Sequence, residues 1–239
     1  MAKYKLLSVN SDAKTSKGFD KGYLTGILYL APADTVGATN TCPRAGACKV
    51  GCLFSAGRGA FDGIWNGRAR KTLLYHYDRQ EFYRQLRADI FRLVREASEL
   101  GKIPAVRLNG TSDLPVLALT MAREFPEVQF YDYTKLPHPW TRQVPNYHLT
   151  QSFDPITVPW SQCLEALSHG ISVAVVFKLG KKFPVPSHWN GIPVIDGDVS
   201  DLRFRDPRGV VVGVRAKGLA RRDTSGFVQV PEASHAIAN

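Results

Sequence analysis

The stretch Ile171-Ser-Val-Ala-Val-Val-Phe177 is almost wholly apolar, and it follows a predicted short helix over 161–169. A continuous apolar run of this length is typical of a strand in a parallel sheet that is covered on both faces. Gly170 lies between the two elements, where a glycine commonly ends a helix. This helix–strand unit therefore predicts an α/β fold built on a parallel sheet.

The same alternation of helical patterns and apolar runs extends along the chain. The clearest helix covers 78–100 and ends at Gly101, and Asp113 is expected to cap a second helix that runs to Phe125. The other predicted strands are 26–33, 104–108, 128–134, 147–153, 193–198 and 210–217. We therefore predict a single-domain (β/α) fold, a TIM-like or partial barrel. An open Rossmann-like sheet is the alternative, although no G-x-G-x-x-G turn supports it.

The two ends of the chain differ from this core. Residues 1–24 are polar and basic and predict an N-terminal arm or an edge strand, whereas 221–239 predict a loosely held tail. We find no internal repeat and no low-complexity linker. The sequence therefore predicts one domain over residues 1–239.

Composition and charge narrow the classes of partner. The chain has 239 residues, a hydrophobic content of 44% and a formal net charge of +10. This charge favours anionic partners, either small carboxylates and phosphates or nucleic acid. Nucleic acid is not favoured, because the basic residues are spread along the chain without a tail or stripe. No apolar run reaches membrane-spanning length and no secretory signal is evident, so we expect a cytoplasmic protein without a membrane partner.

A loop over 40–59 follows the first predicted strand and contains three of the four cysteines. Cys42, Cys48 and Cys52 have the spacing C-x5-C-x3-C, and small residues between them allow three sulfurs to face one point. The pattern predicts a [4Fe–4S] cluster with one iron open to another ligand. Zinc and incidental thiols are the alternatives, and zinc is less favoured because paired C-x2-C knuckles are absent. Cys163 is a possible fourth ligand, but it lies in a predicted apolar helix.

Polar side chains gather where the predicted strands end. In a parallel barrel these ends share the face on which active sites are built. The candidate acid–base groups are Asp132, Lys135, Asp196, Asp198 and Lys217. The candidate substrate-binding residues are Arg58, Arg68, Asn109, Ser112, Tyr131, Tyr133 and Arg215. Each group also has a plainer interpretation as a polar turn, a solvated basic segment or core packing.

Four runs together resemble the phage "gene product 88" family over nearly the whole chain. They are 40–59, 104–113, 130–135 and 194–198. The resemblance implies a phage origin, hence the host cytoplasm, and an iron–sulfur protein. The order of strand, three-cysteine loop, helix and strand also resembles radical S-adenosylmethionine enzymes. Their usual spacing is C-x3-C-x2-C, and their Gly-Gly-Glu-Pro turn is replaced here by Asn109–Asp113. This second resemblance implies a partial (β/α) barrel.

These observations lead to one leading hypothesis and two alternatives. The leading hypothesis is a cluster-dependent hydrolase for a small anionic thiol-containing substrate, such as a glutathione-type peptide. A soft sulfur and two carboxylates would suit an open iron inside a basic rim. The alternatives are an enzyme that cleaves S-adenosylmethionine and a nucleic-acid-binding protein with a structural or redox-sensing cluster.

Overall fold

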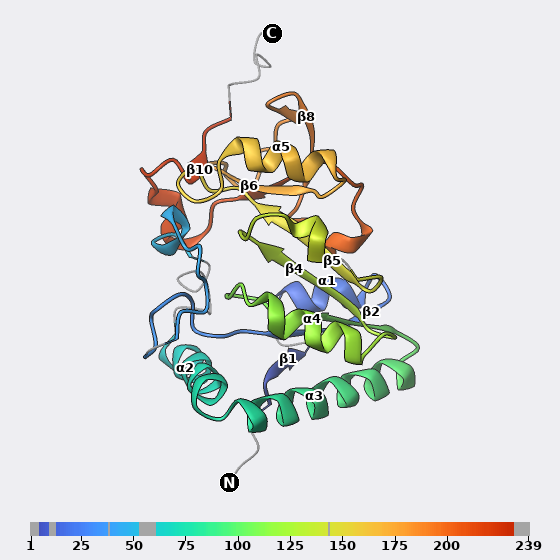
Figure 1. The fold of residues 1–239 in the computed structure, drawn as a ribbon. Helices are drawn as coiled ribbons and strands as arrows, with labels where there is room; N and C mark the ends of the chain where they lie inside the picture. Colours follow the sequence, from blue (N-terminus) through green and yellow to red (C-terminus); the bar gives the residue numbers. More distant parts are fainter. Residues whose placement is uncertain (1–4, 10–12, 38, 53–60, 143, 232–239) are drawn as a thin grey trace.

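The computed structural model describes residues 5–9, 13–37, 39–52, 61–142 and 144–231. Its strands are β1 (Leu7–Val9), β2 (Tyr23–Leu28), β3 (Ile103–Arg107), β4 (Gln129–Thr134), β5 (Tyr147–Ser152), β6 (Val173–Phe177), β7 (His188–Trp189), β8 (Ile192–Asp196), β9 (Val211–Arg215) and β10 (Val228–Gln229). Its α-helices are α1 (Ala13–Phe19), α2 (Asp62–Tyr77), α3 (Arg79–Glu99), α4 (Pro115–Glu124) and α5 (Trp160–Ser168). Figure 1 shows how these elements are arranged.

The strands form one mixed sheet in the order β1-β2-β3-β4-β5-β6-β9-β8-β7, with β10 pairing beside this path to β6. The strands from β2 to β6 are parallel neighbours in chain order, and β9 and β8 continue the parallel part. The α/β class and the parallel sheet are thus confirmed.

The described strands do not form a closed barrel. The antiparallel strand β1 takes up one edge by pairing with β2, and the β7–β8 hairpin forms the other edge. The sheet is therefore open over the residues that the structure describes. The predicted N-terminal arm contains β1 as an edge strand, and α1 as well.

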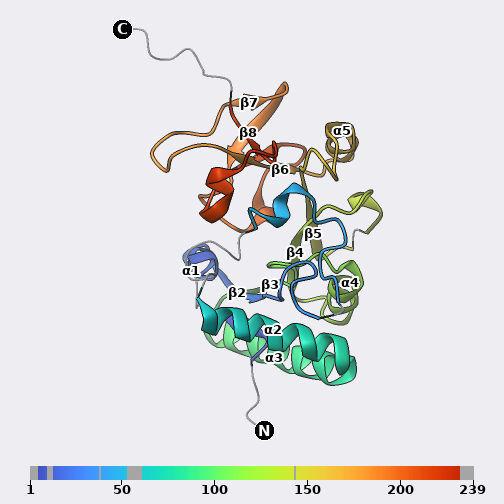
Figure 2. The same cartoon turned by 90° about the vertical axis from the view of Figure 1, so that its left-hand side faces the viewer.

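The long helix α3 covers β1, β2 and β3 and contributes most to the larger core. Its buried stripe repeats every three or four residues and consists of Phe82, Leu86, Ile90, Leu93 and Ala97. The predicted start is confirmed, because Asp78 accepts a hydrogen bond from the backbone N–H of Glu81 at 3.0 Å. Helix α2 lies beside α3 in both ribbon views, while α4 and α5 lie on the opposite side of the sheet from α1 (Figure 2).

The segment around a 3₁₀ turn, η5 (Arg203–Arg205), covers the face of the sheet away from α3 and α4. Tyr131 of β4 is fully buried there, with its ring centroid 5.4 Å from that of Phe204. Arg107 of β3 forms an ion pair with Asp201 at 3.2 Å on this face. Each charge of a buried ion pair needs its partner, so this contact holds the segment against the sheet.

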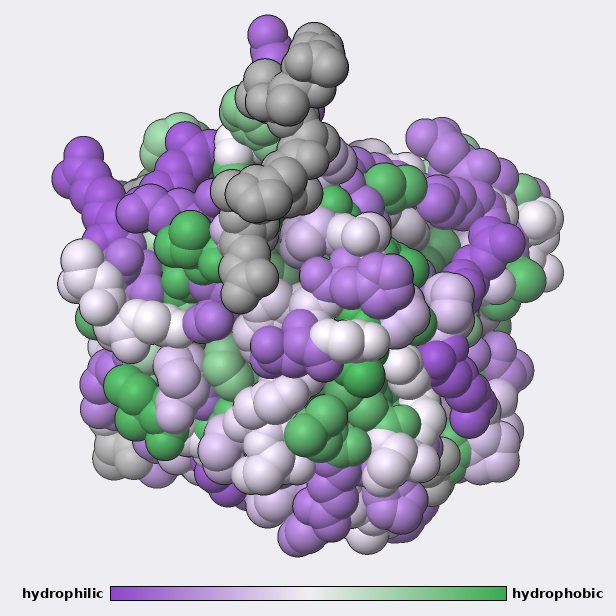
Figure 3. Space-filling model, turned by 90° about the horizontal axis from the view of Figure 1, so that it is seen from above, coloured by the Kyte–Doolittle hydropathy of each residue, from purple (hydrophilic) through white to green (hydrophobic). Residues whose placement is uncertain are grey.

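A membrane-spanning helix must be both long and apolar. None of the described helices combines the length and the apolar character that crossing a membrane requires. Over the described part of the face that carries α5 and β8, hydrophilic and hydrophobic side chains are interspersed (Figure 3).

Candidate functional site

A cavity of about 150 Å³ lies at the carboxyl ends of β2, β3 and β4, under the cysteine loop. Five separate parts of the chain build it, because parallel strands bring their carboxyl ends to one edge of the sheet. Its lining includes Cys42, Cys48 and Cys52 together with Asn109, Ser112, Tyr133 and Lys135. The structure thus brings seven of the residues singled out in the sequence to one place.

The three loop cysteines are each partly buried, and none of them forms a disulfide. The Cys42 sulfur donates to the backbone carbonyl of Thr111 at 3.5 Å, which ties the loop to the turn after β3. Burial raises the pKa of the Cys42 thiol to about 12, and the neighbouring Cys52 adds to the rise. The neighbouring thiols therefore add to the cost of ionising Cys42.

The donor set of this cavity fits an iron–sulfur cluster in its chemistry. Three cysteines are the ligands that such clusters take, and three of them leave one iron for another ligand. No disulfide involves these cysteines, and all three face one cavity. In the described residues, no group of three His, Cys, Asp or Glu side chains is arranged to hold a single metal ion.

Cys163 lies elsewhere. It is fully buried in α5 and belongs to an apolar cluster with Phe153, Val173 and Val211. Burial raises the pKa of its thiol to about 12. In this arrangement the loop supplies three thiols to the cavity and Cys163 supplies none.

The turn after β3 forms one wall of the cavity and is fixed by the side chain of Asn109. The Asn109 amide donates to Asp132 at 3.0 Å, and its carbonyl oxygen accepts from the Ser112 hydroxyl at 2.9 Å and the Leu114 N–H at 2.8 Å. Gly110 is required in this turn, because a Cβ there would lie 2.6 Å from the ring of Tyr29. The turn is therefore closely packed and held by hydrogen bonds inside the protein.

Asp132 supports this turn from below and does not line the cavity. It is 1% exposed and accepts hydrogen bonds from the Asn109 N–H at 2.7 Å and the Tyr147 hydroxyl at 3.1 Å. Burial raises the pKa of Asp132 to about 7, against the opposing charge of Arg107. The structure thus places this predicted acid–base group behind the cavity wall.

Asp113 was expected to cap a helix, and this prediction is wrong. The helix α4 begins instead with Pro115 in its first turn, and its N-cap, Leu114, provides no side-chain hydrogen bond. The Asp113 carboxylate turns toward β4, where it accepts from the Thr134 hydroxyl at 2.9 Å and the Lys135 N–H at 2.8 Å. Burial is the main influence on Asp113 and raises its pKa.

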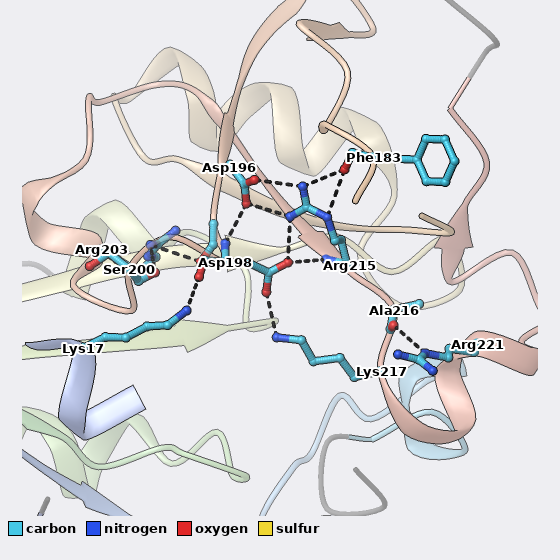
Figure 4. A network of polar contacts seen from close by, with 11 residues as sticks. Lys17, Phe183, Asp196, Asp198, Ser200, Arg203, Arg215, Ala216, Lys217 and Arg221 are labelled. Atoms are coloured by element: carbon cyan, nitrogen blue, oxygen red, sulfur yellow. Dashed lines mark hydrogen bonds and ion pairs between the residues drawn. The ribbon is translucent and has the colours of Figure 1, made fainter. Parts of the chain in front are cut away.

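The other predicted acid–base groups form a separate network (Figure 4). Arg215 contacts Asp196 at 2.9 Å and Asp198 at 3.1 Å, and Lys217 contacts Asp198 at 2.7 Å. Hydrogen bonding to Arg215 lowers the pKa of Asp196. Burial raises the pKa of Asp198, but the hydrogen bonds that it accepts from Lys217 and Arg215 outweigh this effect and lower the pKa overall. None of these four side chains lines the cysteine cavity.

Three further candidates are Arg68, Tyr133, which lines the cavity, and Arg58. Arg68 of α2 is buried, with its guanidinium carbon 5.3 Å from the ring centroid of Tyr29, and burial lowers its pKa. Its Nε and Nη1 have no hydrogen-bond partner in the structure as described. Tyr133 lies against Arg107, and burial raises the pKa of its hydroxyl to about 12. Arg58 lies outside the described residues.

The comparison with protein families decides the assignment. The family described as gene product 88 matches residues 5–231. The chain belongs to the gene product 88 family. Comparisons with curated proteins and with solved structures give no match. The predicted resemblance to this phage family is thus confirmed for nearly the whole chain.

One residue of this gene product 88 protein was missed in the sequence. Asp154 is fully buried two residues after β5 and forms an ion pair with Lys135 at 2.5 Å. In the sequence Asp154 is a polar residue just after a predicted strand, as the other candidate residues are. The stretch Phe153-Asp-Pro155 reads as an ordinary turn in the sequence, so only the fold shows what the carboxylate contacts.

Proposed function

We propose that this gene product 88 protein holds a [4Fe–4S] cluster on Cys42, Cys48 and Cys52 and acts on a small anionic substrate in the same cavity. The observation that supports this proposal is that three thiols of one loop and the polar ends of three parallel strands line one space. When bound, such a cluster supplies a soft, Lewis-acidic iron. Cys163 remains in the core, so the loop provides three ligands.

The charges around the cavity support an anionic substrate. Its described lining contains a single carboxylate, Asp113, and four cations, Arg44, Lys49, Arg107 and Lys135, of which the last three pair with Asp34, Asp201 and Asp154 outside the lining. Fixed positive charges in a recessed site attract anions and raise their local concentration. A thiol peptide of the glutathione type combines a soft sulfur with two carboxylates, and we propose this class of molecule as the substrate.

Lys135 is the residue that we propose to assist hydrolysis. Lys135 lines the cavity and its ammonium group is held by the Asp154 carboxylate, and we propose that this group donates a hydrogen bond to a substrate oxygen. Ser112 offers a hydroxyl group in the same lining. By contrast, Asp196, Asp198 and Lys217 are engaged with one another or with Arg215 outside the cavity.

The experiment incubates iron-loaded protein with thiol peptides and follows the products by chromatography. We expect peptide cleavage by the wild type, and a loss of about 10²–10⁴-fold in rate in Lys135→Met, because positioned proton donors contribute factors of this size. The matched control is Lys181→Met at an exposed lysine. Absence of cleavage for every thiol peptide would remove the hydrolase proposal and leave cluster binding to be tested alone.

Cleavage of S-adenosylmethionine is the second candidate function. It is supported by the order of elements, because the cysteine loop follows the first parallel strand and the turn after the second parallel strand lines the same cavity. The two functions are separated by one product. Formation of 5′-deoxyadenosine under reducing conditions would favour this candidate over the hydrolase.

A further inference from the structure

Asp154 receives hydrogen bonds from three separate segments of the chain. Its Oδ2 accepts from the backbone N–H of Cys48 at 3.2 Å and from the Lys135 ammonium at 2.5 Å. Its Oδ1 accepts from the N–H groups of Ile156 at 3.1 Å and Thr157 at 3.3 Å. A fully buried carboxylate is stable only with such partners, and here the partners connect the cysteine loop to the ends of β4 and β5.

The cysteine loop is shaped to approach this carboxylate. A Cβ at Gly46 would lie 2.9 Å from Asp154 Oδ1 and 2.7 Å from Thr157 Cγ2, so only glycine permits the contact. The Thr157 hydroxyl donates to the Arg44 carbonyl at 3.1 Å, and the Arg44 guanidinium donates to the Thr157 carbonyl. The loop from Arg44 to Cys48 is therefore docked on the residues that follow β5.

Lys135 is fixed by the same carboxylate from the other side. Its side chain is 12% exposed, and its ammonium lies 5.2 Å from the ring centroid of Phe227. Its backbone N–H donates to Asp113 at 2.8 Å. Because the pair is nearly buried, removing either partner leaves an uncompensated charge. The position of the ammonium therefore depends on Asp154.

We propose that Asp154 is the positioning residue of the cysteine cavity. One carboxylate fixes the backbone of Cys48 and the ammonium of Lys135, so that the ligand loop and the cavity cation share one geometry. The functional meaning of this inference rests on the proposed function, in which Cys48 is a ligand and Lys135 meets the substrate. The docking of the loop does not depend on any bound group, and it is tested separately.

The first test measures the alkylation rate of each cysteine in metal-free, reduced protein by maleimide labelling and peptide mass spectrometry. Asp154→Asn should raise the rate at Cys48 about tenfold, because a hydrogen bond to a charged group contributes about 1.5 kcal/mol or more. Cys42 is the internal control, because its sulfur forms a hydrogen bond with the Thr111 carbonyl. Cys163 reports global unfolding. Asp34→Asn is the matched variant, because it removes an exposed carboxylate that pairs with Lys49 of the same loop.

The proposal is supported if the alkylation rate rises in the part of the cysteine loop that follows Cys42, while the rates at Cys42 and Cys163 stay unchanged. Equal Cys48 rates in the wild type and in Asp154→Asn overturn it. If Cys163 also reacts, Gly46→Ala decides, because it displaces the loop from Asp154 while leaving the carboxylate in place. A selective rise at Cys48 in Gly46→Ala supports the docking, and an unchanged rate there overturns it.

The second test uses the iron-loaded protein and measures its midpoint reduction potential. Removing the Asp154 charge should raise the potential and removing the Lys135 charge in Lys135→Met should lower it, because nearby charge sets cluster potentials. A purely structural role would not give shifts of opposite sign. Shifts in the same direction would overturn the role of this pair at the cavity. Failure of the wild type to bind iron would remove the proposed function but leave the alkylation result valid.

Discussion

Replacing Asn109 with alanine should destabilise the turn that forms one wall of the cavity. The side chain makes one hydrogen bond to the Asp132 carboxylate and accepts two more, from the Ser112 hydroxyl and the Leu114 N–H. A bond to a charged group contributes about 1.5–3 kcal/mol, and each neutral bond about 0.5–1.5 kcal/mol. The sum predicts that the free energy of unfolding falls by roughly 2.5–6 kcal/mol.

The assay is thermal and urea denaturation of metal-free, reduced protein, followed by circular dichroism. A chain of this size loses roughly 2–4 °C in Tm per kcal/mol, so Asn109→Ala should lower Tm by about 5–24 °C. The matched control is Asn66→Ala at an exposed position of α2, where alanine is the better helix former and stability should hold. Equal stabilities of the two variants would refute the reasoning that Asn109 fixes the turn.

Three further predictions test other parts of the structure. The folded-state pKa of Asp132 is about 7, above its ordinary value of 3.8. Its contribution to stability is therefore complete below about pH 4 and is lost as pH rises toward 7, by at most about 1.4 kcal/mol per pH unit. Urea titrations from pH 4 to 8 should show this decline in the wild type and a weaker one in Asp132→Asn; parallel curves would contradict the assignment. Arg107→Met should cost about 3–5 kcal/mol because it removes the cation that compensates the nearly buried Asp201 carboxylate, whereas Arg68→Met should cost far less because its Nε and Nη1 lack hydrogen-bond partners in the described structure. Equal losses in denaturation midpoints would refute this contrast. Cys163→Ala should leave the iron content unchanged, and a loss of iron in that variant would make Cys163 a ligand.

Most of the parallel strands could be predicted from the sequence, because their residue patterns are recognisable there. Apart from Ser172, the run from Ile171 to Phe177 is apolar since both faces of β6 are covered, and β9 begins in the same way, whereas β4 and β5 mix apolar or aromatic residues with polar ones. The helix α3 is predicted at both ends, because its capping residue, its apolar stripe and Gly101 agree. Agreement between local signals and tertiary packing makes such elements predictable.

Helix α2 could not be predicted in the same way. Its apolar residues lie around the whole helix, with Ile64 and Leu73 exposed and Tyr75 buried, so no periodic stripe marks one face. Glycines at 63 and 67 weaken the helical signal further. Packing against α3 stabilises this helix, and such tertiary packing is invisible in the sequence.

The rule that polar strand ends meet at one edge was right in part. Asn109, Ser112 and Lys135 lie at the cavity as this rule predicts, because β3 and β4 are adjacent strands. Asp198 and Lys217 do not line the cavity. Strands β8 and β9 lie beyond β6 in an open sheet, and Asp198 and Lys217 at their ends pair with each other there. Closure of the barrel would have been needed to bring all these ends together.

The central claim is that Cys42, Cys48 and Cys52 hold an iron–sulfur cluster. Its most direct test is the iron and acid-labile sulfide content per chain after purification without oxygen, beside a variant in which all three cysteines are alanine. We predict about four irons and four sulfides in the wild type and their loss in the variant, as a [4Fe–4S] cluster requires. Zinc, or no metal in either protein, would contradict the claim and favour a basic binding protein instead.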